Sequence, residues 1–229
     1  MKKAFALVLI LLVAIFAASA AFFWFIARGD LWLFKIAEYE KADRVHPPKP
    51  GVIVFTGSSS IRLWSTLEAD MKPLDVINRG FGGATIADVN RFEARVVLPY
   101  KPRAVVLYAG DNDLFLWRKS PETVLEEFKR FVEIVHTQFP EAWIYFISIK
   151  PAPKGGWDVF HKTNGMIAAY IRTKDHVQFI DVSSAMLDEN GHLRPGFYGS
   201  DPFHMNASGY VLWTSIIKPV LMDRFGSAP

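Results

Sequence analysis

The strongest constraint on the fold is a set of five short, continuous apolar runs spaced along the chain after residue 50. They are rich in β-branched residues, and such runs are typical of strands buried on both faces of a parallel sheet. Helix-length segments separate several of them, so right-handed β-α-β crossovers are expected. The sequence predicts an α/β fold, a doubly wound parallel sheet with helices on both faces. The predicted strands are residues 52–55, 75–78, 104–108, 143–147 and 177–181.

The clearest helix lies between the third and fourth runs. Ser120 is a suitable N-cap residue for this helix. Pro121 suits the first helical position, because the backbone N–H that proline lacks has no partner within the helix at that position. Apolar residues then recur at helical spacing up to Val135. Weaker helical patterns cover residues 87–98 and 163–174, and a last helix begins near residue 206.

The first 28 residues form a separate segment. No charged residue occurs from Ala4 to Ala27, and a helix of that length reaches roughly 36 Å, more than a hydrocarbon core of about 30 Å. Residues 1–28 are therefore expected to form a transmembrane anchor or an uncleaved signal. Two lysines precede the run, so the positive-inside rule sends the rest of the chain across the membrane. A cleaved signal peptide is the alternative, because residues 18–20 are small.

Residues 29–50 connect this segment to the predicted domain. A loosely helical pattern over residues 31–44 predicts a juxtamembrane helix, and a proline-rich stretch then ends it. The domain is expected to span residues 51–225.

Composition excludes several classes of function. The chain has 229 residues, enough for one domain and the N-terminal segment. Its formal net charge of +3 gives little support to a nucleic-acid partner, and none is expected. It has no cysteine, which excludes disulfides, a thiolate nucleophile and cysteine-bound zinc. It contains neither a nucleotide-binding P-loop motif nor a His-Glu-x-x-His zinc motif.

Four short segments carry polar residues suited to hydrolysis. In a parallel sheet the carboxyl ends of the strands lie at one edge, so segments that follow strands are expected to converge there. Each segment alone also fits an ordinary turn or helix cap. Together, in this order, they indicate one site. The segments are Gly57-Ser58-Ser59, Gly82-Gly83, Gly110-Asp111-Asn112-Asp113 and Asp201-Pro202-Phe203-His204.

These residue types point to acyl chemistry. Ser59, at a turn from strand to helix, suits a nucleophile, but its hydroxyl needs a base to take the proton. His204 is the predicted base, and Asp201 is the group that holds its tautomer. The N–H groups of Ser59 and Gly83 and the side-chain amide of Asn112 are the predicted donors to the oxyanion.

The segments resemble those of the SGNH hydrolase family, also called GDSL-type esterases and lipases. The resemblance covers most of the predicted domain and all four blocks of the family. It implies that Ser59 is the nucleophile, that Gly83 and Asn112 lie in the oxyanion hole, and that Asp201 and His204 complete the triad. It also implies a three-layer α/β/α, flavodoxin-like fold with strand order 2-1-3-4-5, no metal and no organic cofactor.

Two positions depart from the family pattern. Ser58 stands where the family usually has aspartate, and Ala84 where aspartate is common. Neither position holds a catalytic group, so the departures concern loop rigidity and substrate preference more than activity. The run of three serines leaves Ser58 and Ser60 as rival nucleophiles, and the register of the motif favours Ser59.

The sequence therefore predicts serine-dependent hydrolysis of carboxylic esters on the extracytoplasmic side of a bacterial-type inner membrane, or in the periplasm or outside the cell if the N-terminus is cleaved. The expected substrate is a small-molecule, lipid or glycan ester. An O-acyltransferase or deacetylase acting on envelope glycans and a catalytically silent glycan-binding module are the alternatives. Trp157, in the loop after the fourth strand, is a candidate pocket residue, as are Trp64, Tyr108 and Trp117.

Overall fold

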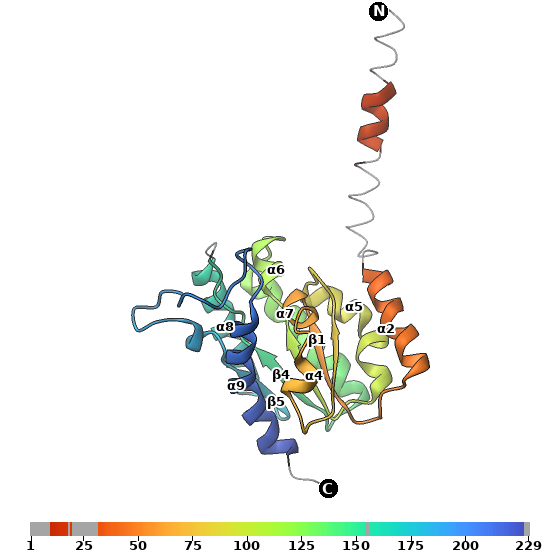
Figure 1. The fold of residues 1–229 in the computed structure, drawn as a ribbon, viewed down its shortest axis with the longest axis vertical. Helices are drawn as coiled ribbons and strands as arrows, with labels where there is room; N and C mark the ends of the chain where they lie inside the picture. The colour runs from red at the N-terminus through yellow and green to blue at the C-terminus, as the bar shows by residue number, and fades with distance from the viewer. Residues whose placement is uncertain (1–9, 18, 20–31, 154–155, 227–229) are drawn as a thin grey trace, which may run out of the picture.

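The computed structural model describes residues 10–17, 19, 32–153 and 156–226. Its body is built on a five-stranded parallel sheet with the order β2-β1-β3-β4-β5 (Figure 1). This confirms the predicted α/β class and strand order. The strands are β1 Ile53–Gly57, β2 Val76–Gly80, β3 Ala104–Tyr108, β4 Trp143–Ile147 and β5 Val177–Ile180. The main helices are α2 Leu33–Val45, α3 Ser59–Arg62, α4 Leu67–Asp70, α5 Ile86–Val96, α6 Asp111–Phe115, α7 Pro121–Gln138, α8 Trp157–Ile171 and α9 Ala207–Phe225.

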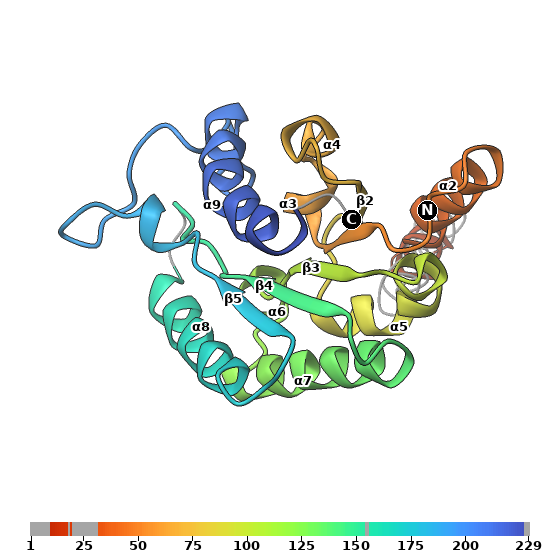
Figure 2. The same cartoon turned by 90° about the horizontal axis from the view of Figure 1, so that it is seen from below.

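Helices cover both faces of the sheet, which gives three layers (Figure 2). Helices α5, α7 and α8 lie on one face, and α3, α4 and α9 on the other. Successive strand residues point to opposite faces: Val54 and Val105 join the core beneath α5, α7 and α8, whereas Phe55 and Val106 join the core beneath α9. Burial on both faces explains why the strands read as continuous apolar runs.

Most element boundaries agree with the sequence analysis. Strands β3 and β4 have the predicted bounds, and β1 extends two residues beyond its predicted end, to Gly57. Ser120 caps α7 by accepting a hydrogen bond from the N–H of Thr123 at 3.1 Å, and Asn206 caps α9. Helix α8 begins earlier than predicted, because Gly156 in the left-handed region starts it.

Helix α2 packs onto the body. Trp32, immediately before it, is buried in the core that α5 covers. The Tyr39 hydroxyl donates to the carbonyl oxygen of Gly80 at the end of β2, at 2.5 Å, and Glu40 pairs with Arg95 of α5 at 2.6 Å. The helix expected to connect membrane and domain therefore covers the edge of the sheet at β2, a position that shields an edge strand from other chains.

The predicted transmembrane segment, residues 1–28, lies mostly outside the described residues. Residues 10–17 are helical and exposed. In the described part of the chain, no helix combines the length and the apolar character needed to cross a bilayer.

Candidate active site

Ser59 lies where β1 turns into α3. Gly57 permits this turn, because its φ is 126° and a Cβ there would lie 1.9 Å from the carbonyl oxygen of Tyr108 on β3. The three consecutive serines have different surroundings. Ser58 and Ser60 are buried, and their hydroxyls have no hydrogen-bond partner among the described residues. Ser59 alone of the three borders the cavity described below.

His204 and Asp201 reach Ser59 from the loop between β5 and α9. The Nε2 atom of His204 lies 3.0 Å from Oγ of Ser59, and Nδ1 lies 3.0 Å from Oδ2 of Asp201. Both distances are within the hydrogen-bond reach that proton transfer requires. The structure thus brings together the three residues that the sequence selected.

Backbone groups hold the carboxylate of Asp201 in place. Its Oδ1 accepts hydrogen bonds from the N–H groups of Phe203 and His204, both at 2.8 Å. These bonds, with a smaller contribution from the His204 side chain, lower the pKa of Asp201 to about 2. The carboxylate is therefore ionised near neutral pH. It favours a proton on Nδ1 of His204, which leaves Nε2 as the atom that accepts from Ser59.

The three predicted oxyanion donors surround the same cavity. Ser59 is the first residue of α3, so its N–H has no acceptor within the helix. Gly83 has a φ of 77°, in the left-handed region. Asn112 donates one Nδ2 hydrogen to the carbonyl oxygen of Ala84 at 3.1 Å, and the amide has a second hydrogen to offer.

The cavity beside Ser59 has a volume of about 410 Å³. Much of its lining is apolar and comes from α6, α8 and the loops that follow β4 and β5. This lining suits the acyl chain or another apolar group of a small ester. The apolar lining residues are Phe115, Leu116, Ala152, Phe160 and Phe203.

Charged groups also border the cavity. Lys150 is buried, with Nζ 3.5 Å from Oδ2 of Asp111. Burial lowers the pKa of Lys150, and the carboxylate of Asp111 opposes this effect. The same carboxylate accepts from the Tyr108 hydroxyl at 3.0 Å and from the N–H of Asn112 at 2.9 Å. Asp111 therefore links Lys150 to a predicted oxyanion residue. Among the described residues, no group of three or more His, Asp or Glu side chains is placed to hold a metal ion.

The aromatic pocket residues named from the sequence do not border this cavity. Trp64 and Tyr108 are buried in the core beneath α9, and Trp157 packs against the opposite core. Trp117 is exposed nearby. The sequence analysis missed Arg62 and Phe115, although each follows a predicted site residue by three positions on a helix, a spacing that places side chains on one face. Phe160 gave no such signal, because α8 was expected to begin after it.

Known proteins share the family and the fold of this chain. The model of the GDSL-like Lipase/Acylhydrolase family matches residues 50–212. A GDSL-like lipase from Bacteroides thetaiotaomicron superposes with a TM-score of 0.70 and 21% identity, covering 82% of this chain and 97% of that one. A lipase/acylhydrolase from Enterococcus faecalis gives 0.62 and 23%, over 76% and 96%. A carbohydrate esterase family 3 protein from Talaromyces cellulolyticus gives 0.61 and 16%, over 78% and 100%. A search of curated proteins finds no match.

The fold and the site together define the class. A doubly wound parallel sheet with serine, histidine and aspartate gathered at its carboxyl edge is the arrangement of SGNH-type hydrolases. The chain belongs to the GDSL-like lipase/acylhydrolase family, as the sequence motifs predicted.

Proposed function

We propose that the protein hydrolyses carboxylic esters through an acyl-enzyme formed on Ser59. The observation that supports this is the pair of 3.0 Å contacts from Ser59 to His204 and from His204 to Asp201. A serine hydroxyl is a weak nucleophile until a base takes its proton. These contacts supply the base and the carboxylate that orients it.

The reaction then has two halves. Oγ of Ser59 attacks the ester carbonyl carbon while its proton moves to Nε2 of His204; the bond to the alcohol oxygen breaks, and the alcohol leaves with that proton. Water next attacks the acyl-enzyme and gives a proton to His204. The acid departs as this proton returns to Oγ. Asp201 stays ionised and stabilises the imidazolium that forms in each half.

The developing oxyanion needs donors that are already in place. The N–H groups of Ser59 and Gly83 and the amide of Asn112 border the space where it would form. In other acyl-transfer enzymes the loss of one such donor raises the barrier by about 2.7 to 4 kcal/mol.

Three alanine variants test the proposal. Ser59→Ala is expected to lower turnover of aryl esters by at least about 10³-fold, because the attacking atom is removed. Ser58→Ala and Ser60→Ala are the matched controls and are expected to keep most activity, since their hydroxyls face the interior. Turnover would be measured across aryl esters from acetyl to long acyl chains, which also defines the preferred chain length.

A fluorophosphonate probe gives an independent readout, because it labels only an activated serine. Labelling of the wild type that is lost in Ser59→Ala is the expected result. Labelling that persists in Ser59→Ala would refute the assignment. An unlabelled wild-type protein without esterase activity would favour the silent glycan-binding alternative.

We also propose that residues 1–28 anchor the chain in a membrane, with the hydrolase domain on the extracytoplasmic side. The uncharged run from Ala4 to Ala27, preceded by two lysines, supports this. Extraction of membranes with alkaline carbonate is expected to leave the full chain in the membrane pellet. Release of a shortened chain would favour a cleaved signal peptide.

A further inference from the structure

Large apolar side chains are exposed at or directly next in sequence to residues that line the cavity, Arg62 and Leu116. Leu116 and Trp117, which follow α6, are 60% and 49% exposed, and Leu63 after α3 is 37% exposed. Helices α3 and α6 both begin at the carboxyl edge of the sheet, beside Ser59 and Asn112. Leu116 itself borders the cavity. We refer to Leu63, Leu116 and Trp117 as the rim cluster.

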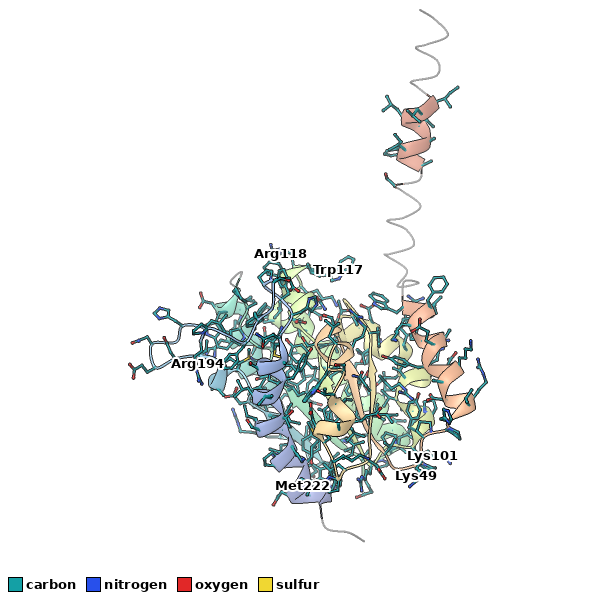
Figure 3. The ribbon with its side chains drawn as sticks, viewed as in Figure 1. Lys49, Lys101, Trp117, Arg118, Arg194 and Met222 are labelled. Atoms are coloured by element: carbon teal, nitrogen blue, oxygen red, sulfur yellow. The ribbon has the colours of Figure 1, made fainter. Side chains whose placement is uncertain are left out.

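The folded body also begins beside the cavity, at Trp32 and the first turn of α2. The indole N–H of Trp32 donates to the carbonyl oxygen of Gly82 at 2.6 Å, and Gly82 borders the cavity. Phe34, in the first turn of α2, is 73% exposed. The start of α2 lies at the same end of the body as α6 (Figure 1). Trp117 is at this end too, whereas Lys49 and Met222 are at the other (Figure 3).

The length of chain before Trp32 restricts how this end can lie. The uncharged run ends at Ala27, five positions before Trp32, and an extended chain spans at most about 3.6 Å per residue, or roughly 18 Å here. A domain of this size has a radius of gyration of about 16 Å, so its diameter is well above the length of this connecting segment. The connecting segment is therefore too short to let the domain turn freely away from the membrane. If the run occupies a bilayer, Trp32 and the cavity beside it stay close to the membrane surface.

The chemistry of this end suits a lipid headgroup layer. Tryptophan is favoured at the boundary between water and lipid, where its ring is half in each environment. Arg62 and Arg118 are exposed beside the rim cluster, and cations there can meet lipid phosphates. Several large apolar side chains exposed in one region are typical of a surface that contacts a membrane or another protein.

We propose that the cavity-bearing end of the body rests on the bilayer, with the rim cluster and Phe34 in the headgroup layer. The site then takes its ester from the lipid layer, so the substrate class is a membrane-borne ester. This inference rests on the proposed anchor and the proposed hydrolase activity.

A labelling experiment tests the orientation, because a chain without cysteine allows one label at a chosen site. Trp117→Cys and, at the opposite end, Lys49→Cys would carry an environment-sensitive fluorophore in the full chain, reconstituted in nanodiscs of phosphatidylcholine and phosphatidylglycerol. We expect a blue-shifted emission and quenching by brominated lipid at position 117 only. Equal, water-like emission at both positions in chains that float with the nanodiscs would overturn the proposal. Chains that do not float would reject both the anchor and the orientation.

Turnover gives the second readout. Trp117 does not border the cavity, so Trp117→Ser is expected to hydrolyse a soluble acetyl ester within twofold of the wild type. Its turnover of a long-chain ester held in the same nanodiscs is expected to fall at least fivefold, with Lys49→Ser unchanged. Equal turnover of the nanodisc ester by wild type and Trp117→Ser would overturn the proposal. A wild type inactive on both esters would reject the hydrolase assignment, and the labels would still report the orientation.

Discussion

Asp201 sets the tautomer of His204, and one substitution isolates this role. In Asp201→Asn the side-chain oxygen can still accept from the N–H groups of Phe203 and His204, while the new amide N–H₂ faces Nδ1. A donor there moves the imidazole proton to Nε2, so His204 can no longer accept the proton of Ser59. We expect kcat to fall about 10⁴-fold, as for the equivalent change in another serine triad.

Asp201→Asn should keep the fold near neutral pH, because both backbone N–H groups still have an acceptor, although the bonds to a neutral amide are weaker; circular dichroism would check the fold. A kcat within tenfold of the wild type would show that Asp201 does not control the tautomer.

Because hydrogen bonds lower the pKa of Asp201 to about 2, its contribution to stability is present above the unfolded pKa near 3.9 and is lost as the pH falls toward 2. Loss of activity at mildly acidic pH should therefore not reflect Asp201.

The sequence identified the triad because Ser59 follows a strand end at a glycine turn, and Asp201 and His204 lie three residues apart just before the last helix. It did not assign a role to Lys150 or Arg62. Lys150 closes an apolar run and is typical of a residue that leaves a strand for solvent. Its burial against Asp111 depends on how β3 and β4 are paired, which a local pattern does not contain.

At the scale of elements, helix α5 contains a buried acidic side chain, and the loss of folding stability that it causes can be measured. Glu93 is 1% exposed, and neither carboxylate oxygen has a hydrogen-bond partner among the described residues. Burial raises the pKa of Glu93 to about 9, and the charge of Arg130 on α7 only partly opposes this. The folded protein therefore binds more protons than the unfolded chain, and stability falls as pH rises from about 4.5 to about 9.

Glu93→Gln keeps the shape and removes this titration. At pH 7 the variant is expected to have a free energy of unfolding roughly 3 kcal/mol higher than the wild type, since each pKa unit corresponds to about 1.4 kcal/mol. The gain should shrink toward zero near pH 4.5. Thermal unfolding of both proteins across this pH range would measure it. A gain that does not change with pH would mean that the carboxyl group is not held neutral by burial.

The strands were predictable because burial on both faces leaves a continuous apolar signal. The packing of α2 on the body was not predictable, because α2 contacts the body partly through charged side chains. Its Asp43 pairs with Arg79 of β2 and its Glu40 with Arg95 of α5. Charged residues in a sequence suggest a solvated face, so the pattern predicted a juxtamembrane helix outside the domain, whereas in the structure α2 packs on the body.

For the whole molecule, this packing predicts where the folded body must begin. A chain of residues 30–229 retains Trp32 and α2, so it is expected to melt at the same temperature as the full chain and to turn over soluble esters equally well. A chain that begins at residue 51, the domain boundary expected from the sequence, loses the buried Trp32 and leaves the buried Arg79 without its carboxylate partner, Asp43. Losses of this kind cost about 3 kcal/mol or more, which corresponds to a Tm lower by about 10 °C for a domain of this size.

Thermal unfolding of the two truncated chains measures the difference directly. Arg79→Met introduced into the 51–229 chain serves as the matched control, because it removes the unpaired charge and should recover part of the lost Tm. Equal melting temperatures for the 30–229 and 51–229 chains would show that α2 adds nothing to the body and that folding begins at residue 51. A lower Tm that Arg79→Met partly restores would instead assign the loss to the ion pair that joins α2 to β2, since the apolar contacts of Trp32 are absent from both 51–229 chains.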